Sequence, residues 1–97
     1  MKLNQDIWLA LNSKNRKRIA EFFIHQDFAV SEREIGKLLD IPSMSTHRIL
    51  KDFEALNFIH ISRVGTANVW KVHKSSYACR VFAQWLHFYK SVSSPFE

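Results

Sequence analysis

The sequence predicts a mainly helical α+β fold with one small β-hairpin. Four stretches carry apolar residues at helical spacing, at about residues 14–25, 31–40, 43–56 and 75–90. Between the last two, residues 58–73 change to the two-residue period that is typical of strands. Because 97 residues suffice for one modest core, we expect a single domain over 1–97 with its core elements at 13–73.

The first helical elements are predicted from short apolar stripes. Ile7, Trp8 and Leu11 have the spacing of a short helix. Ser13 is expected to cap the next helix, which begins at Lys14. The letters SKNRKR place four positive charges in its first turns, where the helix dipole disfavours them. A nearby anion would account for these charges, and so would simple solvation.

The second and third of these helices are joined by a very short turn. Ser31 and Glu34 form a capping box that follows the strand-like Phe28-Ala29-Val30. The helix that starts there should end near Asp40, because Pro42 makes its continuation unfavourable. Only about three residues then precede the helix at 43–56, and two helices joined by so short a turn make a helix-turn-helix.

The helix at 43–56 has two different faces. Its inward face is predicted from the apolar spacing to consist of Thr46, Ile49, Leu50, Phe53 and Leu56. The opposite face centres on Met44, His47, Arg48 and Lys51. One side should therefore anchor the helix in the core and leave the other free.

A β-hairpin is predicted directly after this helix. Ile59 and Ile61 alternate with polar residues in one arm, and Trp70 and Val72 do so in the other. Gly65 is expected in a connecting loop of several residues. A hairpin in this position is the wing of a winged helix.

The charge and the outer helix face indicate double-stranded DNA as the partner. The chain has a formal net charge of +5 and a pI near 9.7, which favours a polyanion. An α-helix fits the major groove, where short polar side chains and Arg can reach base edges and Lys can reach phosphates. A solvated face with no partner is the alternative. The residues of this helix expected to contact DNA are Ser43, Met44, Ser45, His47, Arg48 and Lys51. At the start of the preceding helix, Ser31 and Arg33 could hold a phosphate.

The stretch SEREIGKLLDIPSMSTHRILKDFEALNFI resembles the helix-turn-helix of winged-helix regulators of the MarR and ArsR kind. LNSKNRKRIAEFFI resembles their first helix, and RVGTANVWKV resembles their wing, so the resemblance spans residues 13 to 73. The matching positions in the motif are Ile35, the small Gly36, Leu39, Ile41, Thr46 and Ile49.

The resemblance implies that the helix at 43–56 enters the major groove and that the hairpin touches the DNA backbone or minor groove. Arg63, Thr66 and Asn68 become wing contacts by position, although Asn68 could equally be a turn residue.

The chain departs from the family's pattern at three positions. Asp40 and Asn57 stand where the family usually has Gly, and both residue types tolerate left-handed backbone. Pro42 stands where a Ser often caps the recognition helix. Either Ser43 takes over that role or the cap is lost.

Other classes of function find little support. The five His and the single Cys show no metal-ligand spacing, so we expect no metal and no cofactor, and Cys79 is expected in the core. There is no phosphate loop, nucleophile motif or paired-carboxylate signature, so we expect no enzyme. No apolar run is long enough to cross a membrane, and a lone cysteine suits a reducing compartment, so the expected location is the cytoplasm. Nothing in the sequence specifies a small-molecule effector.

The last helix carries an apolar stripe that is broad for so small a core. This stripe, together with the N-terminal apolar residues, predicts a homodimer. Packing of the two terminal helices on each other within one chain is the alternative. The residues expected at the dimer interface are Trp8, Leu11, Val81, Phe82, Trp85, Phe88 and Tyr89.

The sequence thus predicts a sequence-specific DNA-binding regulator that acts as a homodimer. The alternative is a winged-helix adaptor with little DNA specificity, for example one accessory to a nucleotidyltransferase-type partner. Binding that weakens steeply with salt would favour the first hypothesis.

Overall fold

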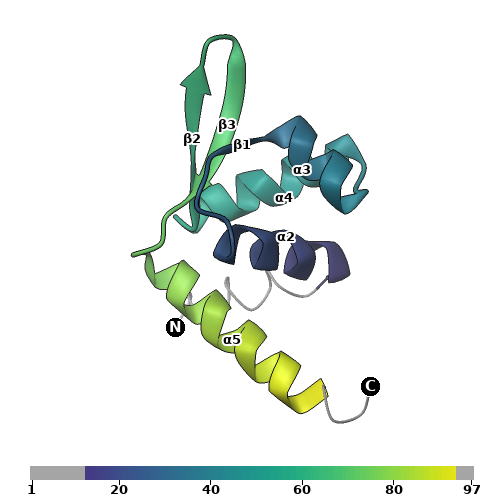
Figure 1. Ribbon diagram of the computed structural model, residues 1–97, viewed down its shortest axis with the longest axis vertical. Coiled ribbons are helices and arrows are strands. Elements are labelled where there is room, and N and C mark those ends of the chain that lie inside the picture. The colour runs from purple at the N-terminus through teal and green to yellow at the C-terminus, as the bar shows by residue number, and fades with distance from the viewer. Residues whose placement is uncertain (1–12, 94–97) are drawn as a thin grey trace.

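The computed structural model describes residues 13–93, which fold as four helices and a three-stranded antiparallel sheet (Figure 1). The predicted helix at Ile7–Leu11 lies outside this range. The mainly helical α+β fold with a hairpin wing is confirmed. In chain order the elements are α2 (Lys14–Ile24), β1 (Val30–Ser31), α3 (Glu32–Leu39), α4 (Ser43–Ala55), β2 (Ile59–Val64), β3 (Ala67–Val72) and α5 (Tyr77–Ser93).

The turn between α3 and α4 is held by local geometry. The Ser31 hydroxyl caps α3 by accepting a hydrogen bond from the Glu34 backbone N–H at 3.1 Å, as the capping box predicts. At the other end Asp40 adopts left-handed backbone with φ 55°, and Asn57 does the same after α4 with φ 62°. The two positions where the regulators that the sequence resembles usually have Gly therefore need the backbone conformation that Gly allows, and Asp and Asn supply it.

Close approach between the two helices explains the small residue in α3. A Cβ on Gly36 would lie 3.2 Å from the Ile41 carbonyl oxygen and 3.4 Å from the Thr46 hydroxyl oxygen. The Ile41 N–H donates to the Gly36 carbonyl at 3.0 Å, which brings the turn back over the helix. The buried Thr46 hydroxyl lies 3.0 Å from the Pro42 carbonyl oxygen and 3.3 Å from that of Ile41. The turn between α3 and α4 is thus closely packed, with no room for a larger residue at position 36.

The hairpin lies within the predicted residues 58–73, but its strands pair farther toward the turn than the sequence predicted. Strand β3 lies between β1 and β2, and Trp70 pairs with Val30 on one side and with Ile61 on the other. Pairing continues to Val64 and Ala67, so only two residues connect the strands. The expected loop of several residues is wrong, because Gly65 takes a φ of 63° and closes the hairpin tightly.

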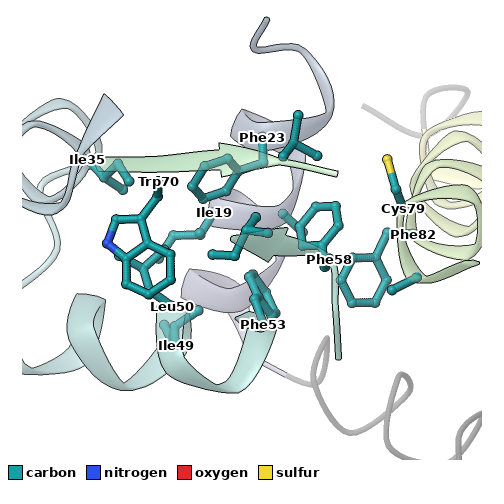
Figure 2. Packing of buried hydrophobic residues seen from close by; sticks show 14 of the residues in the cluster. Ile19, Phe23, Ile35, Ile49, Leu50, Phe53, Phe58, Trp70, Cys79 and Phe82 are labelled. Atoms are coloured by element: carbon teal, nitrogen blue, oxygen red, sulfur yellow. The ribbon is translucent and has the colours of Figure 1, made fainter. Parts of the chain in front are cut away.

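The core is built around aromatic rings (Figure 2). Phe58 lies at its centre, with ring centroids 4.7 Å from Phe82, 5.4 Å from Phe53 and 6.1 Å from Phe23. Trp70 is also buried, and its indole N–H has no hydrogen-bond partner among the described residues. These rings connect α2, α4, the wing and α5 in one cluster.

The prediction that Phe82 lies at the dimer interface is wrong. Its side chain is fully buried against Phe53 and Phe58 of the same chain, so it cannot contact a partner. Leu86, in the same apolar stripe, is buried as well. The apolar stripe of α5 is broad partly because some of its residues, such as Phe82 and Leu86, pack into the chain's own core.

The basic cluster at the start of α2 links three other elements. Arg16 forms an ion pair of 2.6 Å with Asp52 of α4. Lys17 lies over the ring of Trp85 in α5, 5.4 Å from the centroid. Arg18 donates a hydrogen bond to the Leu39 carbonyl at the end of α3. Three of the four positive charges thus have partners within the chain, and one of these partners is the carboxylate of Asp52. Neither a bound ligand nor solvation alone is needed to explain why these three residues are basic.

We predict that Gly36→Val lowers the free energy of unfolding by about 1–3 kcal/mol, because the new side chain would be forced against the turn backbone. Lys37→Val is the control, since Lys37 is exposed in the same helix and the change introduces the same β-branched residue away from the turn. Intrinsic helix propensity favours Val over Gly and Lys over Val, so a larger loss of stability in Gly36→Val reports the contact with the turn. Urea unfolding of both variants measures the difference. Equal stabilities would show that the turn is not tightly packed.

We also predict that Cys79 reacts slowly with alkylating reagents while the protein is folded. Burial raises the pKa of the Cys79 thiol, and the nearby Lys74 opposes this only in part. At pH 7–8 the thiolate, which is the reactive form, should therefore be scarce in the folded state. Mass spectrometry after iodoacetamide treatment should show little labelling in buffer and complete labelling in urea. Rapid labelling of the folded chain would contradict the buried position.

Candidate nucleic-acid interface

The two faces of α4 lie as the sequence predicts. Thr46, Ile49, Leu50 and Phe53 are buried, and Leu56, just beyond the helix, is half-buried. The opposite face, with Met44, His47, Arg48 and Lys51, is exposed. Helix α5 packs against α2 and lies at the end of the molecule away from the wing (Figure 1), where it leaves this face open.

A cleft of about 530 Å³ lies between the outer face of α4, the start of α3 and the wing. Residues that are far apart in the sequence meet there, with Trp70 and Ile61 among the lining residues on the wing side. The predicted DNA-contacting residues that line it are Ser31, Arg33, His47, Lys51 and Asn68. These five predicted DNA-contacting residues come from three separate segments of the sequence, and the structure brings them together in one cleft.

Arg48 is available for a ligand. Its guanidinium is exposed and has no hydrogen bond or ion pair with the described residues. Lys51, one turn later, forms an exposed ion pair of 3.0 Å with Glu54. Such a pair is weak in water, so Lys51 can exchange this carboxylate for a phosphate at little cost.

His47 is held by a residue that the sequence did not single out. Its Nδ1 lies 3.1 Å from each carboxylate oxygen of Glu32, the first residue of α3. The two residues are 15 positions apart, so no helical or strand spacing could predict the pair. Lys37, which was also missed, lines a second cleft of about 420 Å³ together with Arg33 and Ser43.

The N-terminus of α4 is uncapped. Pro42 occupies the N-cap position and offers no side-chain acceptor, and Ser43 is already the first helical residue. Of the two outcomes left open by the sequence, the cap is therefore lost. The backbone N–H groups of Ser43, Met44 and Ser45 have no partner among the described residues, and no acidic side chain lies in this first turn. Free N–H groups at a helix start attract anions.

The start of α3 is less suited to a phosphate than predicted. The Ser31 hydroxyl is engaged with Glu34, and Glu32 and Glu34 both place negative charge in the first turn. Of the two predicted residues, Arg33 is the one that still offers an exposed group to an anion. An anion in this region would contact Arg33 rather than the helix start.

The three wing residues lie along one hairpin. Arg63 and Asn68 are directly paired and exposed, and Thr66 follows Gly65 in the turn. Asn68 is thus a strand residue, and the alternative that it is a turn residue is wrong. Of these three residues only Asn68 lines the 530 Å³ cleft, while Arg63 lies opposite it on the neighbouring strand and Thr66 lies at the tip of the hairpin.

Residues 13–93 contain no group of three or more potential metal ligands. Nor does this part of the chain contain a helix long and apolar enough to cross a membrane.

Comparison with known proteins gives structural matches only. No family model matches the sequence, and no curated protein does so either. The homodimeric winged helix-turn-helix DNA-binding domain of Mb0332 from Mycobacterium bovis, a possible ArsR-family transcriptional regulator, is similar with a TM-score of 0.77 and 12% identity over 99% of this chain and 87% of that one.

HlyU from Vibrio cholerae has a TM-score of 0.71 and 13% identity over 89% of both chains. The ArsR-family transcriptional regulator RHA00566 has a TM-score of 0.66 and 15% identity over 96% of this chain and 92% of that one. Identities this low establish shared architecture and nothing finer. The chain therefore has the winged helix-turn-helix fold that these proteins share.

Proposed function

We propose that this protein is a sequence-specific double-stranded DNA-binding protein that regulates transcription as a homodimer. The observation that carries the proposal is the free outer face of α4, which is exposed, cationic and bordered by the wing across one cleft. A helix anchored on one side and free on the other suits insertion into the major groove. The similarity to winged-helix DNA-binding regulators supports the same assignment.

Most of the affinity would come from phosphates. The free N–H groups at the start of α4 would donate hydrogen bonds to one phosphate. Lys51 lies about two turns farther along the helix, and Arg33 and Arg63 extend the positive charge to α3 and to the wing. Contacts of this kind position the protein on the duplex and carry no sequence information themselves.

Specificity would come from the first two turns of α4. Arg48 can donate two parallel hydrogen bonds to the O6 and N7 atoms of guanine. Ser43, Met44, Ser45 and His47 precede it on the same part of the helix, close enough to the groove floor to contact neighbouring bases. Occupancy of an operator would be the mechanism of regulation.

A second copy of the chain would dock on α5. Phe88 is 66% exposed on this helix, and Val81 and Trp85 are half-buried, so each leaves apolar surface to cover. Trp8 and Leu11 lie outside the described residues, as does the side chain of Tyr89. Mb0332 is described as homodimeric, which supports the proposal. A twofold dimer would present two α4 helices to half-sites about one DNA turn apart.

The competing function is a protein-interaction module that docks through α5. The exposed Phe88 would suit that role as well as it suits a dimer. The response to salt separates the two hypotheses, because DNA binding falls steeply as salt rises, whereas apolar docking hardly changes.

We predict different effects for two cations on the outer face of α4. Arg48→Ala should cost about 1–3 kcal/mol at one base pair of the selected site and relax the preference there. Lys51→Ala should weaken binding to all sequences alike and reduce the slope of log K against log salt by about 1. Fluorescence anisotropy with selected and scrambled duplexes at several salt concentrations measures both effects.

Arg80→Ala is the matched control, since Arg80 is an exposed cation on α5 and does not line the cleft between α4 and the wing. It should leave DNA affinity nearly unchanged. Unaltered affinity and selectivity in both α4 variants would remove α4 as the recognition helix.

We predict that Phe88→Glu weakens self-association by roughly tenfold or more, because a charge would replace an exposed apolar side chain on α5. Phe28→Glu is the control, since Phe28 is even more exposed but lies before β1. Sedimentation velocity gives the dimer fraction. A dimer that survives Phe88→Glu would place the interface elsewhere.

A further inference from the structure

A carboxylate lies in the cleft between α4 and the wing, whose other charged lining residues are the cations Arg33 and Lys51. Glu32 of α3 directs both its oxygens at Nδ1 of His47 in α4, at 3.1 Å each. The His47 side chain is 59% exposed and the Glu32 side chain 31% exposed, so the pair lies at the surface. Both residues line the cleft between α4 and the wing. A negative charge here opposes the binding of a polyanion and therefore calls for an explanation.

The pair fixes which nitrogen of the imidazole carries the proton. A carboxylate can only accept hydrogen bonds, so the Nδ1 that it contacts must carry the hydrogen. In the neutral ring the other nitrogen, Nε2, then holds a lone pair and can only accept. Nε2 is the far atom of an exposed side chain and has no hydrogen bond to the described residues.

We propose that Glu32 is a specificity-determining residue that holds His47 in the Nδ1–H tautomer, so that Nε2 accepts a hydrogen bond from the exocyclic amine of adenine or cytosine in the major groove. The inference rests on the proposed function, since it requires α4 to enter that groove. Glu32 acts through His47 and touches no base itself, so it is a positioning residue.

The chemistry of the groove makes this a choice between bases. Adenine and cytosine display an amine donor there, whereas guanine displays two acceptors and thymine displays an acceptor and a methyl group. An accepting Nε2 gains a hydrogen bond from the first pair and faces a lone pair in the second. One hydrogen bond of this kind corresponds to a preference of about three- to tenfold.

A simpler role for Glu32 is to place negative charge at the start of α3, where the helix dipole favours it. Glu34 lies in the same first turn and supplies that effect without touching His47, because its carboxylate bonds to Ser31. The two residues therefore form a matched pair. A role through the helix dipole would give both the same phenotype, whereas a role through His47 is specific to Glu32.

The first test concerns the free protein and needs no DNA. Two-dimensional ¹⁵N–¹H spectra of the histidine rings at pH 8, above the range in which ordinary histidines titrate, distinguish a protonated from an unprotonated nitrogen. We expect His47 to show a protonated Nδ1 in the wild-type protein and in Glu34→Gln. In Glu32→Gln the amide can accept or donate, so the Nδ1–H population should fall. An Nε2–H ring in the wild-type protein, or identical spectra in all three, would overturn the inference.

The second test concerns base preference. Duplexes bound by the wild-type protein are selected from a random pool at pH 8, and the four variants of each preferred position are compared. At one position, adenine or cytosine should be favoured about three- to tenfold. This preference should disappear in His47→Ala, shrink in Glu32→Gln with guanine now tolerated, and persist in Glu34→Gln.

The outcomes separate the two levels of the account. Selective binding whose base preference is the same in Glu32→Gln and in the wild-type protein would overturn this inference and leave the proposed function standing. A wild-type protein that selects no duplex would overturn the proposed function, and the base preference with it.

Discussion

The buried face of α4 is the constraint on which the rest of the structure depends. Ile49, Leu50 and Phe53 fix the rotation of the helix about its axis, because each is nearly or completely removed from water. Burial of each such side chain contributes on the order of 1.5–3 kcal/mol, so a rotation that exposed all three would cost a large part of the stability of a small domain. Once this face is fixed, the position of every side chain on the opposite face follows.

The turn before α4 extends this constraint to α3. The buried Thr46 hydroxyl contacts two turn carbonyls, and Gly36 leaves room for the backbone to pass within ordinary contact distance. Because the two helices cannot slide past each other, Glu32 at the start of α3 stays beside His47. A surface ion pair contributes little to stability, yet here it would set the hydrogen-bonding character of a side chain on the proposed DNA-contacting face.

The molecule keeps its two proposed interfaces apart. The wing and α4 lie at one end, and α5 lies at the other, with α2 packed between them (Figure 1). The basic residues at the start of α2 serve this arrangement, since Arg16, Lys17 and Arg18 contact α4, α5 and the end of α3 respectively. These basic residues thus hold neighbouring helices together, although a cluster of positive charges by itself would suggest that they bind an anion.

Periodicity predicted most of the fold. The inward face of α4 and the capping box at Ser31 are local features that a few neighbouring residues determine, and both are confirmed. Asp40 does adopt the left-handed backbone that the resemblance led us to expect it to tolerate. What was missed depends on contacts between distant segments. The assignment of Phe82 to an interface was wrong because the sequence gives the width of an apolar stripe and not the part of it that the chain itself covers.

In the candidate site, too, local features were predicted and contacts between distant segments were missed. Arg48 and Lys51 lie on the exposed face of α4 as the helical period requires. Glu32 was missed because its partner is 15 residues away and on another helix. The hairpin turn was predicted too long, because Gly65 marks a turn without specifying how far the pairing extends.

The most direct test of the central claim is to map the amide signals that a selected duplex perturbs in an ¹⁵N-labelled sample. The account predicts that the largest shifts fall on the first half of α4, the start of α3 and the wing, and that α5 changes little in the half that packs on α2. Perturbation confined to α5, with Arg48 and its neighbours unchanged, would contradict the claim that the free face of α4 is the surface that contacts DNA.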